Sequence, residues 1–254
     1  MLPEIKEIIH FQLTGKFAHF RKFYTNSSSL SYNIPPRTVI TGILASILKI
    51  PRDEYYNMFS NENIRISVAI DQKAKIKKIT QSINYLHFKY YNLLIGNKGK
   101  FQHSQCKFEL LMGEKPNNIT YDIYLALLKA ETIYEKLKTC LINKNLGYGI
   151  YLGQRPFKAQ IESVQFLSNN DYKFLPESNF LNSICVSDNV DKFDVTQNPE
   201  VSLLSDRMPC DFNALKKGRE ISSVKTVIHE QHGKRLKGNF KNVVKVNNRF
   251  ISFF

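Results

Sequence analysis

His103 and Lys107 are the residues whose types and spacing could carry out acid–base chemistry. They lie four positions apart in an extended run, and strand residues four apart share a face. A histidine can transfer protons near neutral pH, and a lysine can stabilise charge that develops on a phosphate. The pair would suit metal-independent RNA cleavage. In the simpler interpretation, which we favour, both side chains line a track for RNA phosphates.

The stretch "HFRKFYTNSSSLSYNIPPRT" (residues 19–38) combines basic and aromatic side chains just before a predicted helix. Cations would neutralise phosphates, tyrosines would stack on unpaired bases, and the helix N-terminus would form a weak anion site. The candidate contacts from this region are Lys16, His19, Arg21, Lys22, Tyr24, Tyr32 and Arg37. The alternative is a solvated basic loop whose tyrosines pack on the edge of the domain.

A glycine-rich turn follows at "GYGIYLGQRPF" (residues 147–157), where Gly153 precedes Gln154 and Arg155. Glycine lets a phosphodiester approach the backbone closely. The spacing is neither the dinucleotide fingerprint nor a Walker A loop. Either this is a turn only, or it is part of an RNA-binding surface.

The sequence predicts no metal and no cofactor. His229 and His232 have the helical spacing of two ligands, but HExxH is absent and no third ligand is near. Four widely separated cysteines predict reduced thiols.

The charge predicts a polyanionic partner. The 254 residues contain 36 Lys and Arg against 22 Asp and Glu, a net charge of +14. Such an excess suits nucleic acid or an anionic membrane. The longest apolar run, Val39 to Leu48, is half of what a bilayer requires, and the N-terminus does not resemble a signal peptide. We expect a cytoplasmic protein without membrane contact.

Hydrophobic periodicity predicts an α+β fold. The order β-α-β-β-α-β over residues 1–167 is that of a ferredoxin-like, RRM-type domain. The predicted strands are 4–15, 63–71, 118–128 and two strands within 147–167, one on each side of the glycine turn, and the predicted helices follow Pro36 and span 129–141. A Gly-Asn-Lys-Gly turn between two extended runs also predicts a basic β-hairpin inserted in the middle of this order.

Two further regions differ in composition. Residues 168–200 carry six acidic residues against two lysines and predict an acidic linker or loop. We expect residues 201–254 to form a smaller, β-rich C-terminal region. It is basic, since residues 216–249 alone hold ten Lys or Arg against two Glu.

Four motifs resemble the CRISPR-associated Cas family five, a branch of the RAMP superfamily. They are the run Tyr32 to Thr38 entering a helix with Gly42, "HSQCKFELL" (103–111), "YLGQRPFKA" (151–159) and "RMPCDF" (207–212). The resemblance spans essentially the whole chain, and the chain is most similar to the type I-B branch of the family. It implies an RRM-like domain with a protruding hairpin, or thumb, inserted at about 80–105, and a smaller C-terminal region.

The resemblance also implies a function. A family member caps the foot of the Cascade surveillance complex in antiviral defence. It holds the 5′ handle of the guide RNA and contacts the backbone and large subunits, with target DNA near the protospacer-adjacent motif as a further partner. Carried onto this sequence, the handle contacts are Lys16, His19, Arg21, Tyr32, Arg37, His103, Gln105, Lys107, Gly153, Gln154 and Arg155. The alternative is the precursor-cutting endoribonuclease of the type I-C branch, with His103 and Lys107. A DNA-binding module is third.

Overall fold

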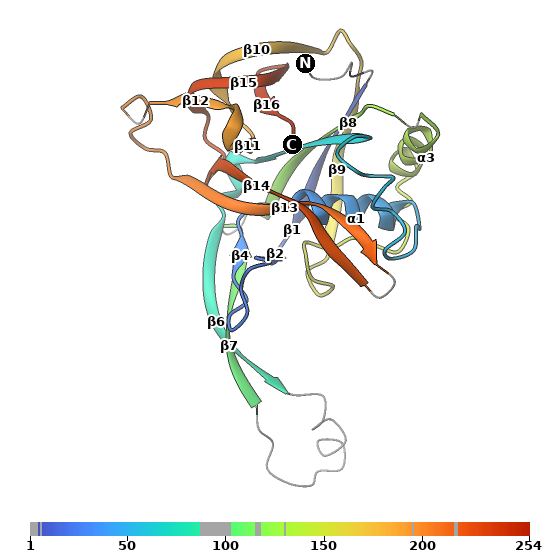
Figure 1. Cartoon of the computed structure of the whole chain (residues 1–254), viewed down its shortest axis with the longest axis vertical. Coiled ribbons are helices and arrows are strands. Elements are labelled where there is room, and N and C mark those ends of the chain that lie inside the picture. Colours follow the sequence, from blue (N-terminus) through green and yellow to red (C-terminus); the bar gives the residue numbers. More distant parts are fainter. Residues whose placement is uncertain are drawn as a thin grey trace.

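The computed structural model describes residues 5, 7–86, 103–114, 118–129, 131–194, 196–215 and 218–254. Within these ranges the protein is mostly β-structure with two α-helices (Figure 1). None of its described helices is long and apolar enough to cross a membrane.

The central sheet contains four antiparallel strands in the spatial order β5-β8-β1-β9. The strands are β1 (Ile8–Gly15), β5 (Ile64–Ile70), β8 (Ile119–Leu127) and β9 (Ala159–Leu167), and the helices are α1 (Arg37–Ile47) and α3 (Glu131–Ile142). In chain order these elements run β-α-β-β-α-β, as the sequence predicts. The first predicted strand begins later than expected, at Ile8.

Both faces of this sheet are covered. Ile9 and Phe11 of β1 pack in the same core cluster as Leu44 of α1 and Leu137 of α3. Ile8 points the other way, because strand residues alternate, and packs against the C-terminal strands. The two helices therefore cover one face, and the C-terminal region covers part of the other.

A long hairpin extends from the body (Figure 1). Strands β6 (Lys77–Leu86) and β7 (His103–Met112) pair antiparallel, and β7 also pairs with β2 (Phe17–Ala18). The predicted insertion at 80–105 falls within this hairpin, although the strands start earlier and end later. Its predicted Gly-Asn-Lys-Gly turn lies outside the described residues. A short pair, β3 (Phe20–Arg21) and β4 (Ser31–Tyr32), closes the loop between β2 and α1.

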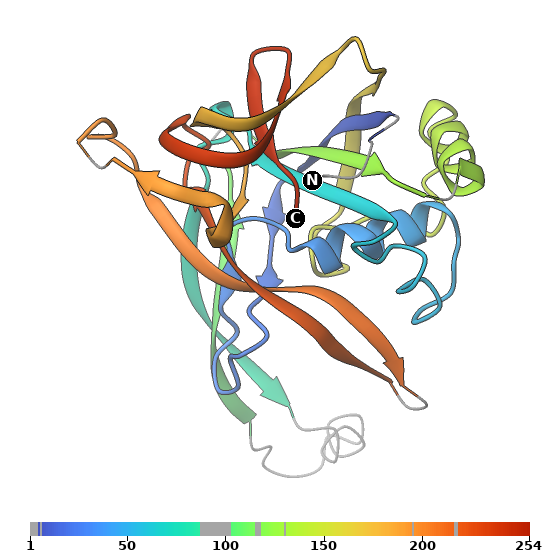
Figure 2. The same ribbon diagram turned by 45° about the horizontal axis from the view of Figure 1, so that its top comes forward.

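The strands from β10 onward form two further sheets, and together they are the C-terminal region of the structure, which begins earlier than the predicted residue 201. One contains β10 (Tyr172–Leu181), β15 (Leu236–Val246), β12 (Val190–Phe193) and β16 (Arg249–Ser252). The other contains β11 (Cys185–Val186), β14 (Gly218–Glu230) and β13 (Leu203–Leu215). Figure 2 shows the long β13–β14 hairpin running across α1.

Residues 168–200 are therefore not the acidic linker that the sequence predicts, because β10, β11 and β12 all lie within them. Leu181 and Cys185 are buried against Phe240 and Val243 of β15. The polar residues occupy the outward positions and the bulges. An average over the segment hides this alternation, and so the composition alone indicates a loop.

Candidate nucleic-acid interface

Arg37 is a core residue rather than a surface cation. Its side chain is 1% exposed at the start of α1. It donates hydrogen bonds to the carbonyl oxygens of Phe59 (2.7 Å), Ile64 (2.9 Å) and Cys210 (3.1 Å) and to Oδ1 of Asp211 (2.5 Å). The guanidinium therefore ties α1 to β13 and to the turn before β5, and it is not available to RNA.

Tyr32 is also enclosed. Its ring is 0% exposed, and its hydroxyl donates to the carbonyl of Arg207 at 2.5 Å. Burial raises the pKa of Tyr32 above its ordinary value. The ammonium of Lys22 lies 5.3 Å from the ring centroid and binds the carboxylate of Asp206. Neither Tyr32 nor Lys22 is therefore placed to contact a splayed nucleotide.

His19 joins three segments beneath the surface. The ring is 1% exposed and stacks on Phe108 with a centroid distance of 4.1 Å. Its Nδ1 lies 2.7 Å from the carbonyl oxygen of Glu109, and its Nε2 lies 2.9 Å from Oγ of Ser29. A carbonyl can only accept, so Nδ1 carries the proton and Nε2 accepts from the serine hydroxyl. Burial lowers the pKa of His19, which favours this neutral form.

These three positions correct the sequence-based contact set. Basic and aromatic residue types are equally suited to an RNA surface and to a polar, satisfied core. A residue of the buried kind has a hydrogen-bond partner in a remote segment of the chain, such as the carbonyl of Cys210 for Arg37 or that of Glu109 for His19. His19, Tyr32 and Arg37 connect segments of the chain that are remote in sequence.

The β6–β7 hairpin presents His103, Gln105 and Lys107 on one face. They alternate along β7 and all three are exposed. Lys107 has no carboxylate partner among the described residues. His103 and Lys107 are about 13 Å apart along the strand, at ~3.3 Å per residue. Their side chains would have to bend toward each other to act on one phosphodiester.

The glycine turn packs directly on the backbone of His19. Gly153 has a φ of +84°, and a Cβ there would lie 1.9 Å from the carbonyl oxygen of His19. The amide of His19 donates to the carbonyl of Leu152 at 3.1 Å. A bond of 2.9 Å from the amide of Phe157 to the carbonyl of Gln154 closes the turn. Because His19 also binds the β7 backbone, the turn and the hairpin base are held together.

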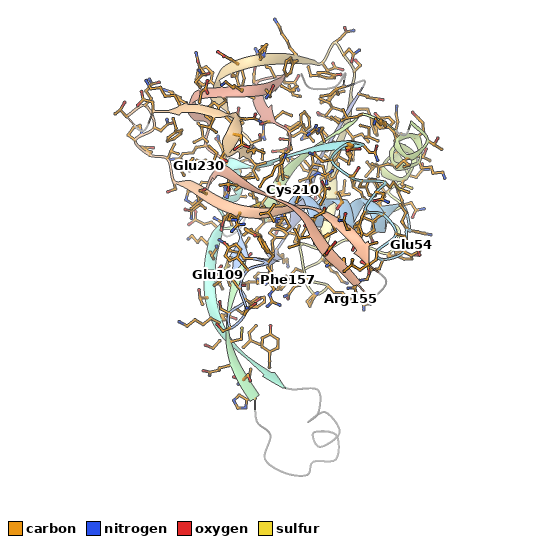
Figure 3. All side chains as sticks on the ribbon, in the orientation of Figure 1. Glu54, Glu109, Arg155, Phe157, Cys210 and Glu230 are labelled. Atoms are coloured by element: carbon orange, nitrogen blue, oxygen red, sulfur yellow. The ribbon has the colours of Figure 1, made fainter. Side chains whose placement is uncertain are left out.

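Basic and aromatic residues lie near the glycine turn and the base of the β6–β7 hairpin. The ring of Phe17 is 39% exposed, lies 6.3 Å from the ring of Phe157, and belongs to the strand that pairs with β7. In the view of Figure 3, Phe157 is labelled between Glu109, at the hairpin base, and Arg155. Lys16, Arg155 and Lys158 are exposed and have no carboxylate partner within the described chain. Arg21 is exposed as well and donates to the carbonyl of Thr25 at 3.0 Å.

A pocket of about 670 Å³ adjoins the glycine turn. Its walls come from α1, the turn, the loop after α1 and the β14 end of the long hairpin, with Arg52, Tyr55, Tyr148, Tyr151 and Arg219 among the lining residues. Tyr148 and Tyr151 are 70% and 43% exposed. Gly149 opens onto the pocket, and a Cβ there would meet nothing within 4 Å. Exposed tyrosines and arginines are groups on which unpaired bases stack.

The sequence reasoning did not select these pocket residues. Tyr148 and Tyr151 stand inside the motif "GYGIYLG", so two tyrosines among three glycines were the available signal. Arg219 could not be found in this way, because it reaches the pocket from a strand some 70 residues further along the chain. The first strand predicted within 147–157 is also absent. Tyr151 makes a single bridge to Lys158, and the positive φ of Gly147 and Gly149 interrupts extended structure.

No group of three or more His, Cys, Asp or Glu in the described parts of the chain could hold a metal ion. His229 is buried, with Nδ1 facing the carbonyl of Glu230 at 3.3 Å. The four cysteines are free thiols, as the sequence predicts.

Comparisons with known proteins place this fold in a class. The structure described as a CRISPR protein from Archaeoglobus fulgidus superposes with a TM-score of 0.54 at 10% identity, covering 96% of this chain and 98% of that one. A chain of a CRISPR RNA-guided surveillance complex gives a TM-score of 0.49 at 12% identity, covering 92% and 91%. No curated protein matches the sequence. The first likeness shows that this chain shares its fold with that CRISPR protein.

The family follows from the sequence itself. The model of the family described as CRISPR-associated protein (Cas_Cas5) matches residues 8–219. This chain therefore belongs to the CRISPR-associated Cas5 family.

Proposed function

We propose that this protein is a non-catalytic subunit of an RNA-guided CRISPR surveillance complex, and that it grips the 5′ handle of the guide RNA. Membership in the Cas5 family and the net charge of +14 support an RNA partner. The overall resemblance of the chain to the type I-B branch supports the assignment to a Cascade-type complex. The same resemblance supports the backbone and large subunits, and target DNA near the protospacer-adjacent motif, as further partners.

One observation carries the proposal: His19 binds both the β7 backbone and the glycine turn. Its ring contacts Phe108 and Glu109, and its own backbone packs against Leu152 and Gly153. Two motifs about 50 residues apart in sequence therefore border one continuous surface. A single RNA segment that leaves the hairpin face would reach the turn by passing the rings of Phe17 and Phe157.

Different residues of the proposed surface contact the phosphates, the base or sugar edges, and an unstacked base. Lys16, Lys107 and Arg155, which have no carboxylate partner among the described residues, provide positive charge for successive phosphates. His103, Gln105 and Gln154 add hydrogen-bonding groups that can contact bases or sugars. The pocket beside Gly149 accepts an unstacked base against Tyr148 or Tyr151. Gly153 contributes by keeping the turn close to His19.

The test is binding of a labelled RNA that carries the repeat-derived 5′ segment, at one fixed salt concentration. The double variant Lys107→Ala/Arg155→Ala should weaken binding by about 2 to 4 kcal/mol if each cation makes one charge-assisted contact. The control variant Lys129→Ala/Lys136→Ala removes the same charge from exposed positions beside and on α3. Equal losses in the two variants would show that only net charge matters and would contradict the proposed surface.

The same preparation tests the nuclease alternative. Repeat RNA incubated with the purified protein in EDTA should stay intact. Site-specific cleavage that disappears in His103→Ala would replace the non-catalytic assignment with a metal-independent endoribonuclease.

A further inference from the structure

A second polar pocket lies in the C-terminal region, away from the surface described above. It has a volume of about 440 Å³ and is formed by β10, β15, β12 and the loop that follows β12. Figure 1 shows these strands at the end of the molecule opposite the β6–β7 hairpin. Its volume is within the range of small-ligand sites, about 300 to 1,000 Å³.

Two β-bulges and a glycine form the pocket. The register of β10 on β15 shifts between Ser178 and Phe180, and that of β12 on β15 shifts between Val190 and Lys192. Both bulges flank the same part of β15, where a Cβ on Gly238 would lie 2.6 Å from the carbonyl of Lys192. Bulges interrupt a flat sheet and redirect side chains, and they are frequent next to functional sites.

The loop at its rim is fixed by Asn198, which is 6% exposed. The amide nitrogen of its side chain donates to the carbonyls of Asp194 (2.6 Å) and Lys237 (2.8 Å), and its Oδ1 accepts from the amide of Lys237 at 3.0 Å. The described part of the loop is therefore held against β15, and the pocket does not depend on a ligand for its shape.

The charges in the pocket are unbalanced toward positive. Lys192 and Lys237 both line it and are exposed, and neither ammonium has a partner among the described residues. The one acidic side chain present, Asp194, is bound within its own turn. Oδ1 accepts from the amide (2.9 Å) and hydroxyl (2.6 Å) of Thr196, and Oδ2 accepts from the side chain of Gln197 at 2.9 Å. The two lysines are therefore free to bind an anion.

The other lining groups suit a planar, hydrogen-bonding ring. Asn179 and Asn239 have side-chain amides with no partner in the described chain, and each amide offers a donor pair and an acceptor. Phe180 provides the apolar wall, and its ring is supported by Phe250 at 5.5 Å and by the guanidinium of Arg235 at 5.5 Å. Amide side chains bind base edges, and aromatic rings in cationic grooves hold single strands.

We propose that this pocket binds one nucleotide, with Lys192 and Lys237 on the flanking phosphate and Asn179 and Asn239 on the base edge, against Phe180. This chemistry is shared by a free nucleotide and by one unstacked residue of a single-stranded nucleic acid. The site is independent of the guide-handle surface, so either proposal can fail alone.

The test uses the full chain and a short oligonucleotide containing 4-thiouridine. After photo-crosslinking, mass spectrometry should find adducts on the peptide that carries Phe180. The variant Lys192→Ala/Lys237→Ala should lower the yield of that adduct about tenfold, as expected for the loss of charge-assisted contacts. The control Lys173→Ala/Lys245→Ala removes two exposed lysines that are cross-strand neighbours on the same strands, outside the pocket, and should lower it less than about twofold.

A second arm distinguishes the two sources of the nucleotide. If uridine monophosphate in excess removes the Phe180 adduct, the pocket accepts free nucleotides. If only unlabelled oligonucleotide removes it, the ligand is a strand. Adducts confined to the hairpin and the glycine turn, or equal losses in the two double variants, would overturn the proposed site.

Discussion

The guanidinium of Arg37 lies 2.5 Å from Oδ1 of Asp211, a residue 174 positions later in the sequence. Three carbonyl oxygens accept from the same side chain. One arginine at the first turn of α1 thus fixes β13 on the helix. Arg37, which the sequence suggested as an RNA contact, is therefore a structural link between α1 and β13.

The substitution Arg37→Ala should lower the free energy of unfolding by at least about 3 kcal/mol. It leaves buried carbonyl groups without a donor and Asp211 without its counter-ion. Urea denaturation measures the loss, and Arg21→Ala, which removes an exposed cation, is the control. A stability equal to that of the unmodified protein would show that the carbonyls find other donors.

Gly153 and Gly149 form a matched pair for measuring the contact of the turn with His19. Both have positive φ, at +84° and +88°, but only at Gly153 would a Cβ collide with the carbonyl of His19. Gly149→Ala should cost about 1 to 2 kcal/mol, from the backbone conformation alone. Gly153→Ala should cost clearly more, because the turn must move away. Equal unfolding midpoints for the two variants would show that the turn does not depend on this contact.

Stability should decrease as the pH falls below about 6.5, in part because of His19. Burial lowers the pKa of its imidazole in the folded protein, so the unfolded chain binds the proton more readily. The contribution is complete above the ordinary histidine value of 6.5 and is lost as the pH falls through the lower folded value. Urea midpoints between pH 8 and pH 5 measure this dependence.

The variant His19→Gln should show a shallower pH dependence over this range, at a lower overall stability. A dependence identical to that of the unmodified protein would assign it to other groups. His103→Gln is the control, because His103 is the first residue of β7 and is exposed.

Binding of the guide RNA should weaken steeply with salt, and the steepness should decrease in variants of the proposed surface. Each phosphate contact on a single strand contributes about 0.7 to the slope of log K against log salt. Lys107→Ala and Lys16→Ala should each reduce the slope by about that amount. An unchanged slope in either variant would remove that lysine from the set of phosphate contacts.

Much of the fold can be predicted from local pattern. The alternation of Ile9, Phe11 and Leu13 indicates a strand with one buried face, and the spacing of Ile40, Ile43, Leu44 and Ile47 indicates an amphipathic helix. These periods depend on near neighbours, so a single sequence reveals them. Segment 168–200 shows the limit of composition, since β10 and β12 are strands with polar outward faces and with bulges that break the period.

By itself, the sequence determined a basic protein of the Cas5 family, the β-α-β-β-α-β order, an inserted hairpin and a glycine turn. Only the tertiary structure decided which basic and aromatic side chains face solvent. His19, Tyr32 and Arg37 are buried because their partners Glu109, Arg207 and Asp211 come from remote strands. A polar group can be buried at little cost only when a partner satisfies it, and long-range packing, not local sequence, supplies that partner.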